Sequence, residues 1–263
     1  MKIRKTFAWA LAACLVAAAA GAQTVDELIA KNLEARGGKD KIKAVKSLRM
    51  TGKMAMGEGM EAPFTMEMAR PNKIRNEFTF QGMTGVQAFD GTSGWMVMPF
   101  MGKKDPEAVS GDDLRRIAEQ ADFDGVLVDY KDKGHQVELV GRADVDGSPA
   151  YKLKVTKKSG DVSYVYLDAE QYLEVKVEGK TKIRGQEIEG ETRLGDYKPV
   201  EGVVFAHSIQ QKAKDAPGGM TISIDKIELN LDVPASRFEM PKAEKPAAEK
   251  PAAEAPAQKP PQR

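Results

Sequence analysis

Residues 47–80 read SLRMTGKMAMGEGMEAPFTMEMARPNKIRNEFTF, and this stretch decides the fold. Apolar side chains recur at every second position in successive runs, and glycine or proline turns separate the runs. A period of two places neighbouring side chains on opposite faces of an extended strand. One face is then buried and the other meets water, which is typical of antiparallel sheets. The stretch therefore predicts antiparallel strands joined by short turns.

The same alternation continues to about Leu231, with turn signals between the runs, and predicts about eleven strands. Helices interrupt this pattern. Thr24 and Glu27 form a capping box that begins one helix, which ends at Gly37-Gly38, and a short helix follows over 40–45. Another is expected over 110–121. The sequence thus predicts one mainly β domain with a few helices over 23–241.

Both ends of the chain differ from this domain. Lys2, Arg4 and Lys5 precede an apolar run that ends in Ala20-Gly21-Ala22, the order of a secretory signal peptide cleaved after Ala22. Export to the periplasm follows from this reading of 1–22. The alternative is a lipid anchor, because Leu11-Ala12-Ala13-Cys14 resembles a lipobox. Residues 242–263 repeat Ala, Pro, Lys and Glu, and their composition predicts a disordered tail.

Several classes of function lack support in the sequence. Forty basic and 39 acidic residues leave a formal net charge of +1, so the chain lacks the basic excess that is typical of nucleic-acid-binding proteins. The one cysteine lies in the predicted signal peptide, so we expect no disulfide and no thiolate nucleophile. His135 and His207 have no neighbours at metal-ligand spacing. Carboxylates are abundant, but nothing singles out an acid–base pair. We expect no enzyme, no metal and no cofactor.

Methionine is the unusual feature of the composition. Ten of the thirteen methionines fall between Met50 and Met101, several of them as M-x-M pairs. On a strand, such a pair places two flexible thioethers on one face. Three interpretations remain open: ordinary core packing, an adaptable apolar cavity, and Cu(I) binding by thioethers.

The order of these features resembles the LolA-like group of exported proteins. The likeness spans about 23–241 and rests on turn and strand patterns: Ala35-Arg36-Gly37-Gly38, Phe89-Asp90-Gly91-Thr92-Ser93-Gly94-Trp95, Asp196-Tyr197, Val200-Glu201-Gly202-Val203 and the ending Asn230 to Phe238-Glu239-Met240-Pro241. The resemblance implies a half-open antiparallel β-barrel of about eleven strands, with helices plugging its concave apolar face. It also implies carriage of lipoproteins or lipids through the periplasm, or sensing by relatives of the same fold.

These observations together predict a non-covalent carrier for a lipid or an acylated lipoprotein. The expected partners are acyl chains and an envelope membrane component, and the protein is expected to be a monomer. The alternatives are a structural or sensory envelope protein with a filled core, and Cu(I) binding. The helix over 110–121 should act as a lid through Leu114 and Ile117. The residues expected to line the cavity are Met54, Met56, Phe64, Met66, Met68, Phe78, Phe80, Trp95 and Met98.

Overall fold

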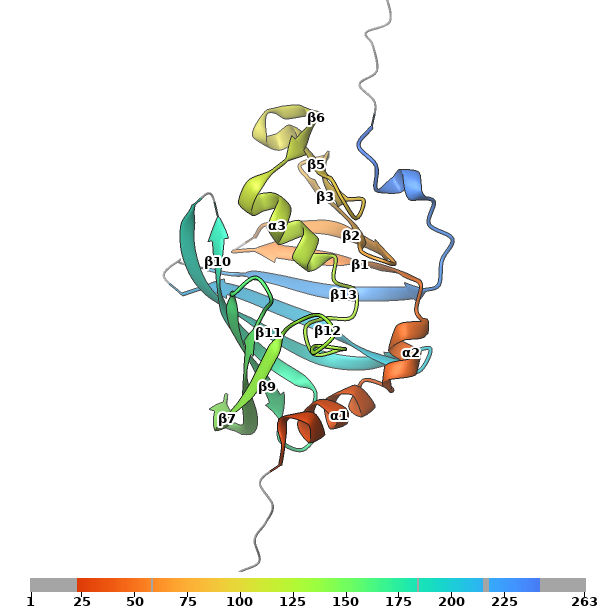
Figure 1. Cartoon of the computed structure of the whole chain (residues 1–263). Coiled ribbons are helices and arrows are strands. Elements are labelled where there is room, and N and C mark those ends of the chain that lie inside the picture. The colour runs from red at the N-terminus through yellow and green to blue at the C-terminus, as the bar shows by residue number, and fades with distance from the viewer. Residues whose placement is uncertain (1–22, 58, 184, 215–217, 242–263) are drawn as a thin grey trace, which may run out of the picture.

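A computed structural model describes residues 23–57, 59–183, 185–214 and 218–241, and their strands form one antiparallel sheet (Figure 1). The predicted signal peptide (1–22) and tail (242–263) lie outside the described residues. The sheet contains thirteen strands: β1 (Ser47–Met56), β2 (Glu61–Ala69), β3 (Lys73–Phe80), β4 (Met83–Phe89), β5 (Gly94–Met98), β6 (Lys103–Val109), β7 (Gln136–Val145), β8 (Ser148–Thr156), β9 (Val162–Asp168), β10 (Glu174–Ile183), β11 (Gln186–Val200), β12 (Val203–Ala213) and β13 (Met220–Leu229).

The strand order makes two meanders that meet in the middle of the sheet. The order is β6-β5-β4-β3-β2-β1-β13-β12-β11-β10-β9-β8-β7, so the first strand pairs with the last. β6 and β7 remain as open edges, and the curved sheet is a half-open β-barrel, as the sequence predicted. The count exceeds the expected eleven. One strand without a clear signal is β6, whose sequence KKDPEAV lacks apolar alternation.

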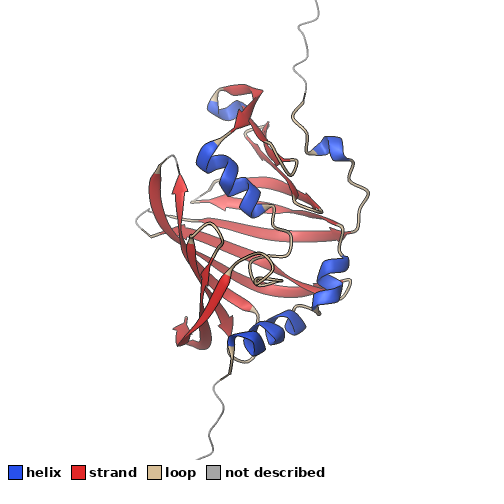
Figure 2. Cartoon of the chain, viewed as in Figure 1, coloured by secondary structure: helices blue, strands red, loops and turns tan. Residues whose placement is uncertain are grey.

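Three α-helices lie against the sheet: α1 (Val25–Ala35), α2 (Lys39–Ala44) and α3 (Gly111–Gln120). Figure 2 shows α3 crossing the hollow of the curved sheet and α1 and α2 along its lower margin. The predicted capping box is present, with Thr24 Oγ1 accepting from the Glu27 amide at 3.3 Å. The chain turns after α1 at Gly37, where φ is +106° and an added Cβ would collide with the Gly202 carbonyl. Only glycine fits there.

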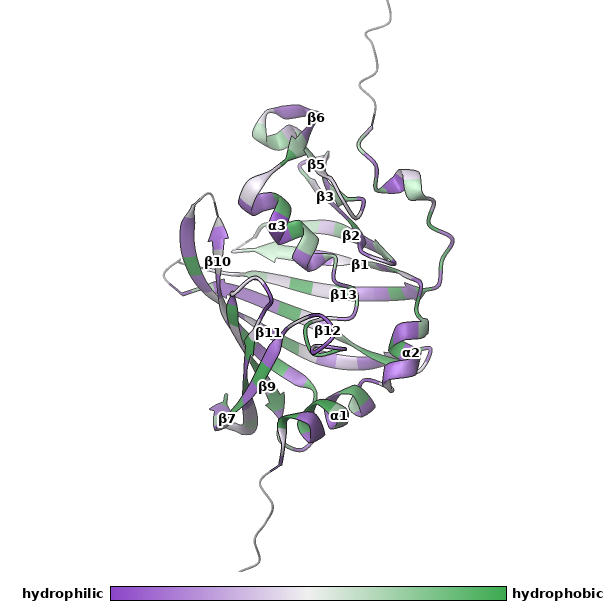
Figure 3. Ribbon diagram, viewed as in Figure 1, coloured by the Kyte–Doolittle hydropathy of each residue, from purple (hydrophilic) through white to green (hydrophobic). Residues whose placement is uncertain are grey.

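Two apolar clusters fill the concave side. Figure 3 shows apolar and polar residues alternating along the strands. In the larger cluster, Ile117 of α3 and Ile42 of α2 pack on strands β1–β4 and β12–β13. In the smaller, Leu28 and Ile29 of α1 pack on Leu153 of β8 and its neighbours in β9. Each helix therefore contributes apolar side chains to the interior, and the helices hold the curvature of the sheet.

The outer face of β2–β5 is covered by the C-terminal strap, residues 231–241, which includes the short 3-10 helix η2 (Ala235–Arg237). Phe238 is fully buried, and its carbonyl accepts a hydrogen bond from Trp95 Nε1 at 2.8 Å. Beside it, Glu67 is 1% exposed. One Glu67 oxygen accepts from Arg49 at 2.7 Å and the other from Arg237 of the strap at 2.8 Å. This buried carboxylate fixes the strap to the sheet.

Electrostatics at Glu67 favour its charged form. Burial opposes ionisation, but hydrogen bonds from Arg49 and Arg237 outweigh it and lower the pKa of the carboxyl below its usual range. A lowered pKa in the folded state stabilises the protein above the pKa of the unfolded chain, about 4.3. This contribution is lost as the pH falls through the folded pKa.

We therefore predict that Glu67→Gln lowers the free energy of unfolding by about 1–3 kcal/mol at neutral pH, because the amide is uncharged and turns an NH₂ donor toward one of the two guanidinium groups. The measurement is urea unfolding followed by the fluorescence of Trp95, the one tryptophan within 23–241. The gap between the two proteins should close as the pH falls below about 4. Glu228→Gln, which removes a partner of Lys226 on the surface, is the matched control and should be nearly neutral. An equal effect of both substitutions would contradict the assignment.

Candidate functional site

Helix α3 presents two different faces to the interior. Leu114, Ile117, Ala118 and Ala121 follow the spacing of one helical face, and all four belong to the larger apolar cluster. The opposite stripe is polar and lines a separate hollow; it consists of Asp112, Arg115, Arg116, Glu119 and Gln120. The helix therefore both plugs the apolar core and roofs a cavity beside it.

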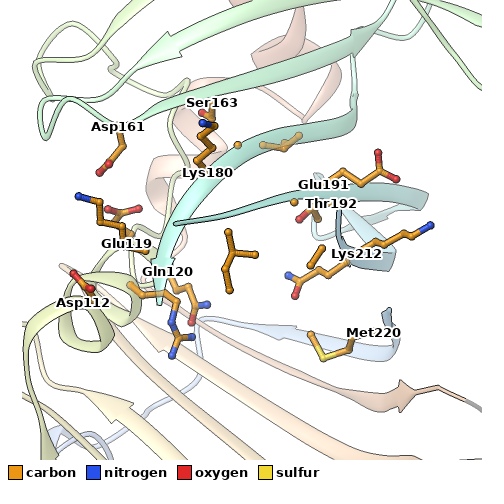
Figure 4. A pocket seen from close by; sticks show the side chains of 18 of the residues that line it. Asp112, Glu119, Gln120, Asp161, Ser163, Lys180, Glu191, Thr192, Lys212 and Met220 are labelled. Atoms are coloured by element: carbon orange, nitrogen blue, oxygen red, sulfur yellow. The ribbon is translucent and has the colours of Figure 1, made fainter. Parts of the chain in front are cut away.

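The floor of that cavity is a row of small residues across four neighbouring strands. Ser163 of β9 lies opposite Gly179 of β10, Gly179 opposite Gly190 of β11, and Gly190 opposite Ala213 of β12. None of the four has a side chain larger than a hydroxymethyl group, so the row leaves space above the sheet. With the roof of α3, it encloses a trough of about 690 Å³. Its residues gather around the open space in Figure 4.

A second row of the floor leads toward the methionine-rich strands. Val177, Thr192, Gln211 and Met220 lie opposite one another across β10–β13, and all line the trough. Met220 in turn lies opposite Met56 of β1. The floor thus changes from small and polar side chains to thioethers as it approaches β1.

Hydrogen bonds connect α3 to strands on the far side of the trough. The Gly185 amide, at the turn between β10 and β11, donates to Asp112 Oδ2 at 3.0 Å. Lys157 Nζ, after β8, lies 2.5 Å from Glu119 Oε2. Both carboxylates belong to the polar stripe, so its two ends are attached to the opposite wing of the sheet. Only two polar contacts therefore hold this side of the helix closed among the described residues.

Charges in the roof are largely compensated within it. Arg115 lies 2.7 Å from Asp112, and Arg116 lies 3.2 Å from Asp113. Arg116 Nε is buried without a hydrogen-bond partner among the described residues. The trough therefore has a polar roof, and Lys180, Glu191 and Lys212 line it beside the small residues of the floor.

The structure brings together most of the residues that the sequence singled out, but outside the trough. Met54, Phe64, Met66, Met68 and Phe78 pack with Leu114 and Ile117 of α3 in the larger apolar cluster. We call these seven residues the Met/Phe cluster. Phe64, Met68 and Ile117 are buried, and the others are half-buried. The predicted wall residues and the two residues of α3 thus belong to one apolar cluster.

The remaining predicted residues lie elsewhere. Met56, Phe80 and Met98 are half-buried near the ends of their strands. Trp95 lies on the opposite face: it packs with Val86 and Ala88 and bonds to the strap. The reason is strand alternation, because Gly94 faces α3 and the next residue must point away. The prediction that Trp95 lines the concave cavity is therefore wrong.

Sequence reasoning missed the floor of the trough and the polar stripe of α3. Gly179 and Gly190 gave a usable signal, because glycine inside a strand often marks a place where something approaches the backbone closely. Their alignment across β10 and β11 required the register. Phe100 was also missed; its ring lies 5.5 Å from that of Phe78 and 6.2 Å from that of Phe80, between centroids.

The histidines are held by the backbone. His207 is buried and its Nδ1 lies 3.0 Å from the Phe205 carbonyl, and His135 Nδ1 accepts from the Lys158 amide at 3.1 Å. Burial, with the charge of Lys133, lowers the pKa of His135. Within the described ranges, no group of three or more His, Cys, Asp and Glu side chains is placed to hold a metal ion. Of the helices described, none has the length and apolar character needed to cross a membrane.

Comparison with known proteins bears on the fold. No protein-family model and no curated protein sequence matches the chain. A LolA superfamily protein from Nitrosomonas europaea superposes with a TM-score of 0.55 at 14% identity, covering 83% of this chain and 98% of that one. The chain has a LolA-like fold.

Two further structures share this LolA-like architecture. A domain named for outer membrane lipoprotein sorting, from Vibrio parahaemolyticus, gives a TM-score of 0.54 at 13% identity over 80% of this chain and 97% of its own. A DUF1329 family protein from Desulfovibrio piger gives 0.58 at 12% identity over 83% and 98%. At these identities the likeness concerns the fold, and the site must be argued from its own residues.

The two contacts at the ends of α3 predict a helix that opens locally. In the double variant Asp112→Ala, Lys157→Ala, we expect amide hydrogen exchange in α3 to become about tenfold faster, because two hydrogen bonds to the far wing are lost. Exchange in β1 and β13 should stay unchanged. Lys198→Ala, which removes a surface contact with Asp196, serves as the control. Unchanged exchange in α3 would show that the apolar stripe alone holds the helix.

Proposed function

We propose that the protein binds an acyl chain of a lipid or acylated lipoprotein, non-covalently, in the trough between α3 and β9–β13. The observation that carries this proposal is the row Ser163–Gly179–Gly190–Ala213, which leaves about 690 Å³ beneath the helix. Cavities for small ligands range from about 300 to 1,000 Å³. A LolA-like fold and an N-terminal segment of signal-peptide type agree with a carrier in the periplasm.

Burial of the chain supplies the affinity in this proposal. Each methylene removed from water contributes about 0.8 kcal/mol. About ten methylenes therefore contribute about 8 kcal/mol, equivalent to a Kd of about 1 μM before the cost of ordering the ligand. No covalent step or cofactor is required, so the function is binding rather than reaction.

Polar groups in the roof define the rest of the ligand. The acyl chain lies on the floor near Val177 and Met220, and the polar part of the amphiphile lies against α3, where Arg115 and Gln120 line the trough. Opening of α3 at Asp112 and Glu119 admits and releases the ligand. Because the other face of α3 covers the Met/Phe cluster, the same movement joins that wall to the trough.

The test is a substitution that fills the floor. Gly179→Leu places a branched side chain in the trough, and its Cβ would lie 3.3 Å from that of Ser163, so only a small adjustment is needed. We expect binding of cis-parinaric acid and of a palmitoylated peptide to weaken at least about tenfold, since part of the buried chain is displaced. Fluorescence titration measures the first and calorimetry the second.

Gly195→Leu is the matched control, because Gly195 lies on β11 with open space around it and lines a different hollow. It should leave both affinities unchanged. The carrier proposal fails if the unsubstituted protein binds neither probe and if native mass spectrometry of the protein purified from cells detects no bound lipid.

A structural or sensory envelope protein with a filled core is the second candidate. The presence of Met54, Met66, Phe78 and Leu114 in one apolar cluster favours it, because apolar side chains occupy this part of the concave face. Absence of ligand binding in the test above would support it. Cu(I) binding is not proposed, since the thioethers of Met66 and Met68 are packed among apolar groups in this cluster.

A further inference from the structure

Three exposed methionines lie at successive hairpin tips of one meander. Met60 lies between β1 and β2, Met83 at the start of β4, and Met101 between β5 and β6 in the short 3-10 helix η1 (Pro99–Met101). They are 46%, 37% and 63% exposed. These turns share one end of the sheet, because alternate turns of an antiparallel meander fall on the same side. We call them the rim tips.

The first rim tip lies beside the mouth of the trough. β13 begins at Met220, opposite Met56 at the end of β1, so the start of β13 lies beside this tip. Gly218, Gly219 and Met220 line the trough at this point. Val162, which begins β9 across the trough, is 36% exposed at the same end. Four of the six large apolar side chains that are exposed among the described residues therefore lie at one end of the sheet.

Apolar packing continues from the core to these tips. Met83 shares the concave face with Gly85, over which Phe100 and Met98 lie. Phe100 in turn packs on Phe78 of the Met/Phe cluster. Exposed thioethers thus extend an apolar surface that begins inside the barrel, and Figure 3 shows apolar residues at the turn before β6 next to polar ones on β6.

Several lysines near this end of the sheet are paired with carboxylates. Lys103 lies 2.6 Å from Glu107, Lys180 lies 2.7 Å from Glu187, and Lys214 lies 3.1 Å from Glu189. Lys53 lies 3.9 Å from Glu61 beside the first tip. Much of the charge around the exposed methionines is therefore compensated locally, which suits the interface of a zwitterionic bilayer better than an acidic or basic protein surface.

We infer that the rim tips are a membrane-docking surface, which places Met60, Met83 and Met101 in a lipid bilayer with the mouth of the trough against it. The inference rests on the proposed lipid binding, because a docked mouth lets an acyl chain pass from bilayer to trough without crossing water. Neighbouring strands lie about 4.8 Å apart, so successive tips are on the order of 10 Å apart. Each thioether then enters the bilayer separately and adds to the affinity.

The experiment is flotation of the mature protein with vesicles of phosphatidylcholine and phosphatidylethanolamine, without added ligand. We expect the protein to float with the vesicles. The triple variant Met60→Gln, Met83→Gln, Met101→Gln should reduce the bound fraction at least about tenfold. Binding should change little with salt or with added phosphatidylglycerol, because paired charges are not the source of affinity. Met240→Gln with Val140→Thr removes exposed apolar groups elsewhere, and this control should float normally.

The outcomes separate this inference from the proposed function. Binding of cis-parinaric acid in solution tests the trough without any bilayer, and the methionine variant should retain it. A protein that binds this probe but does not float overturns the docking surface alone. If the protein self-associates through the same methionines and does not float, the membrane-docking surface is overturned, and the rim tips bind a second copy of the chain instead. A protein that floats but does not bind cis-parinaric acid supports the docking surface and overturns the proposed binding in the trough.

Discussion

The pairing of β1 with β13 is the constraint on which the rest of the structure depends. It joins a six-stranded meander to a seven-stranded one through nine opposed residue pairs, from Leu48–Leu229 to Met56–Met220. Without it the two wings have no fixed relation. The trough, formed by strands of the second wing, lies under a helix anchored in the first wing. Its roof and floor therefore meet only because the first strand and the last are neighbours.

Helix α3 divides the concave face into two environments by the spacing of its own residues. One stripe, with Leu114 and Ile117, completes an apolar core, and the other lines the trough. A single short helix thus completes an apolar core on one side and roofs the trough on the other. This division explains how an interior rich in methionine and phenylalanine is packed while a cavity persists beside it.

Much of the fold could be predicted from the sequence, because alternation, capping and turn residues act locally. The capping box at Thr24 and the end of α1 before Gly37 follow from such signals. The site was harder. The thioethers were visible as M-x-M pairs, but whether they surround a space or fill one depends on what packs opposite them. The row through Gly179 and Gly190 depends on register over four strands, and no local pattern reports it.

The row Ser163–Gly179–Gly190–Ala213 also determines how readily the volume of the trough can change through substitution. In a strand, side-chain size and backbone pairing are independent, so a larger residue at position 179 alters the volume while the hydrogen bonds of the sheet remain. The capacity of the trough is therefore separable from the stability of the barrel. Chains of this architecture can therefore differ in the volume beneath α3 through one or two substitutions in this row.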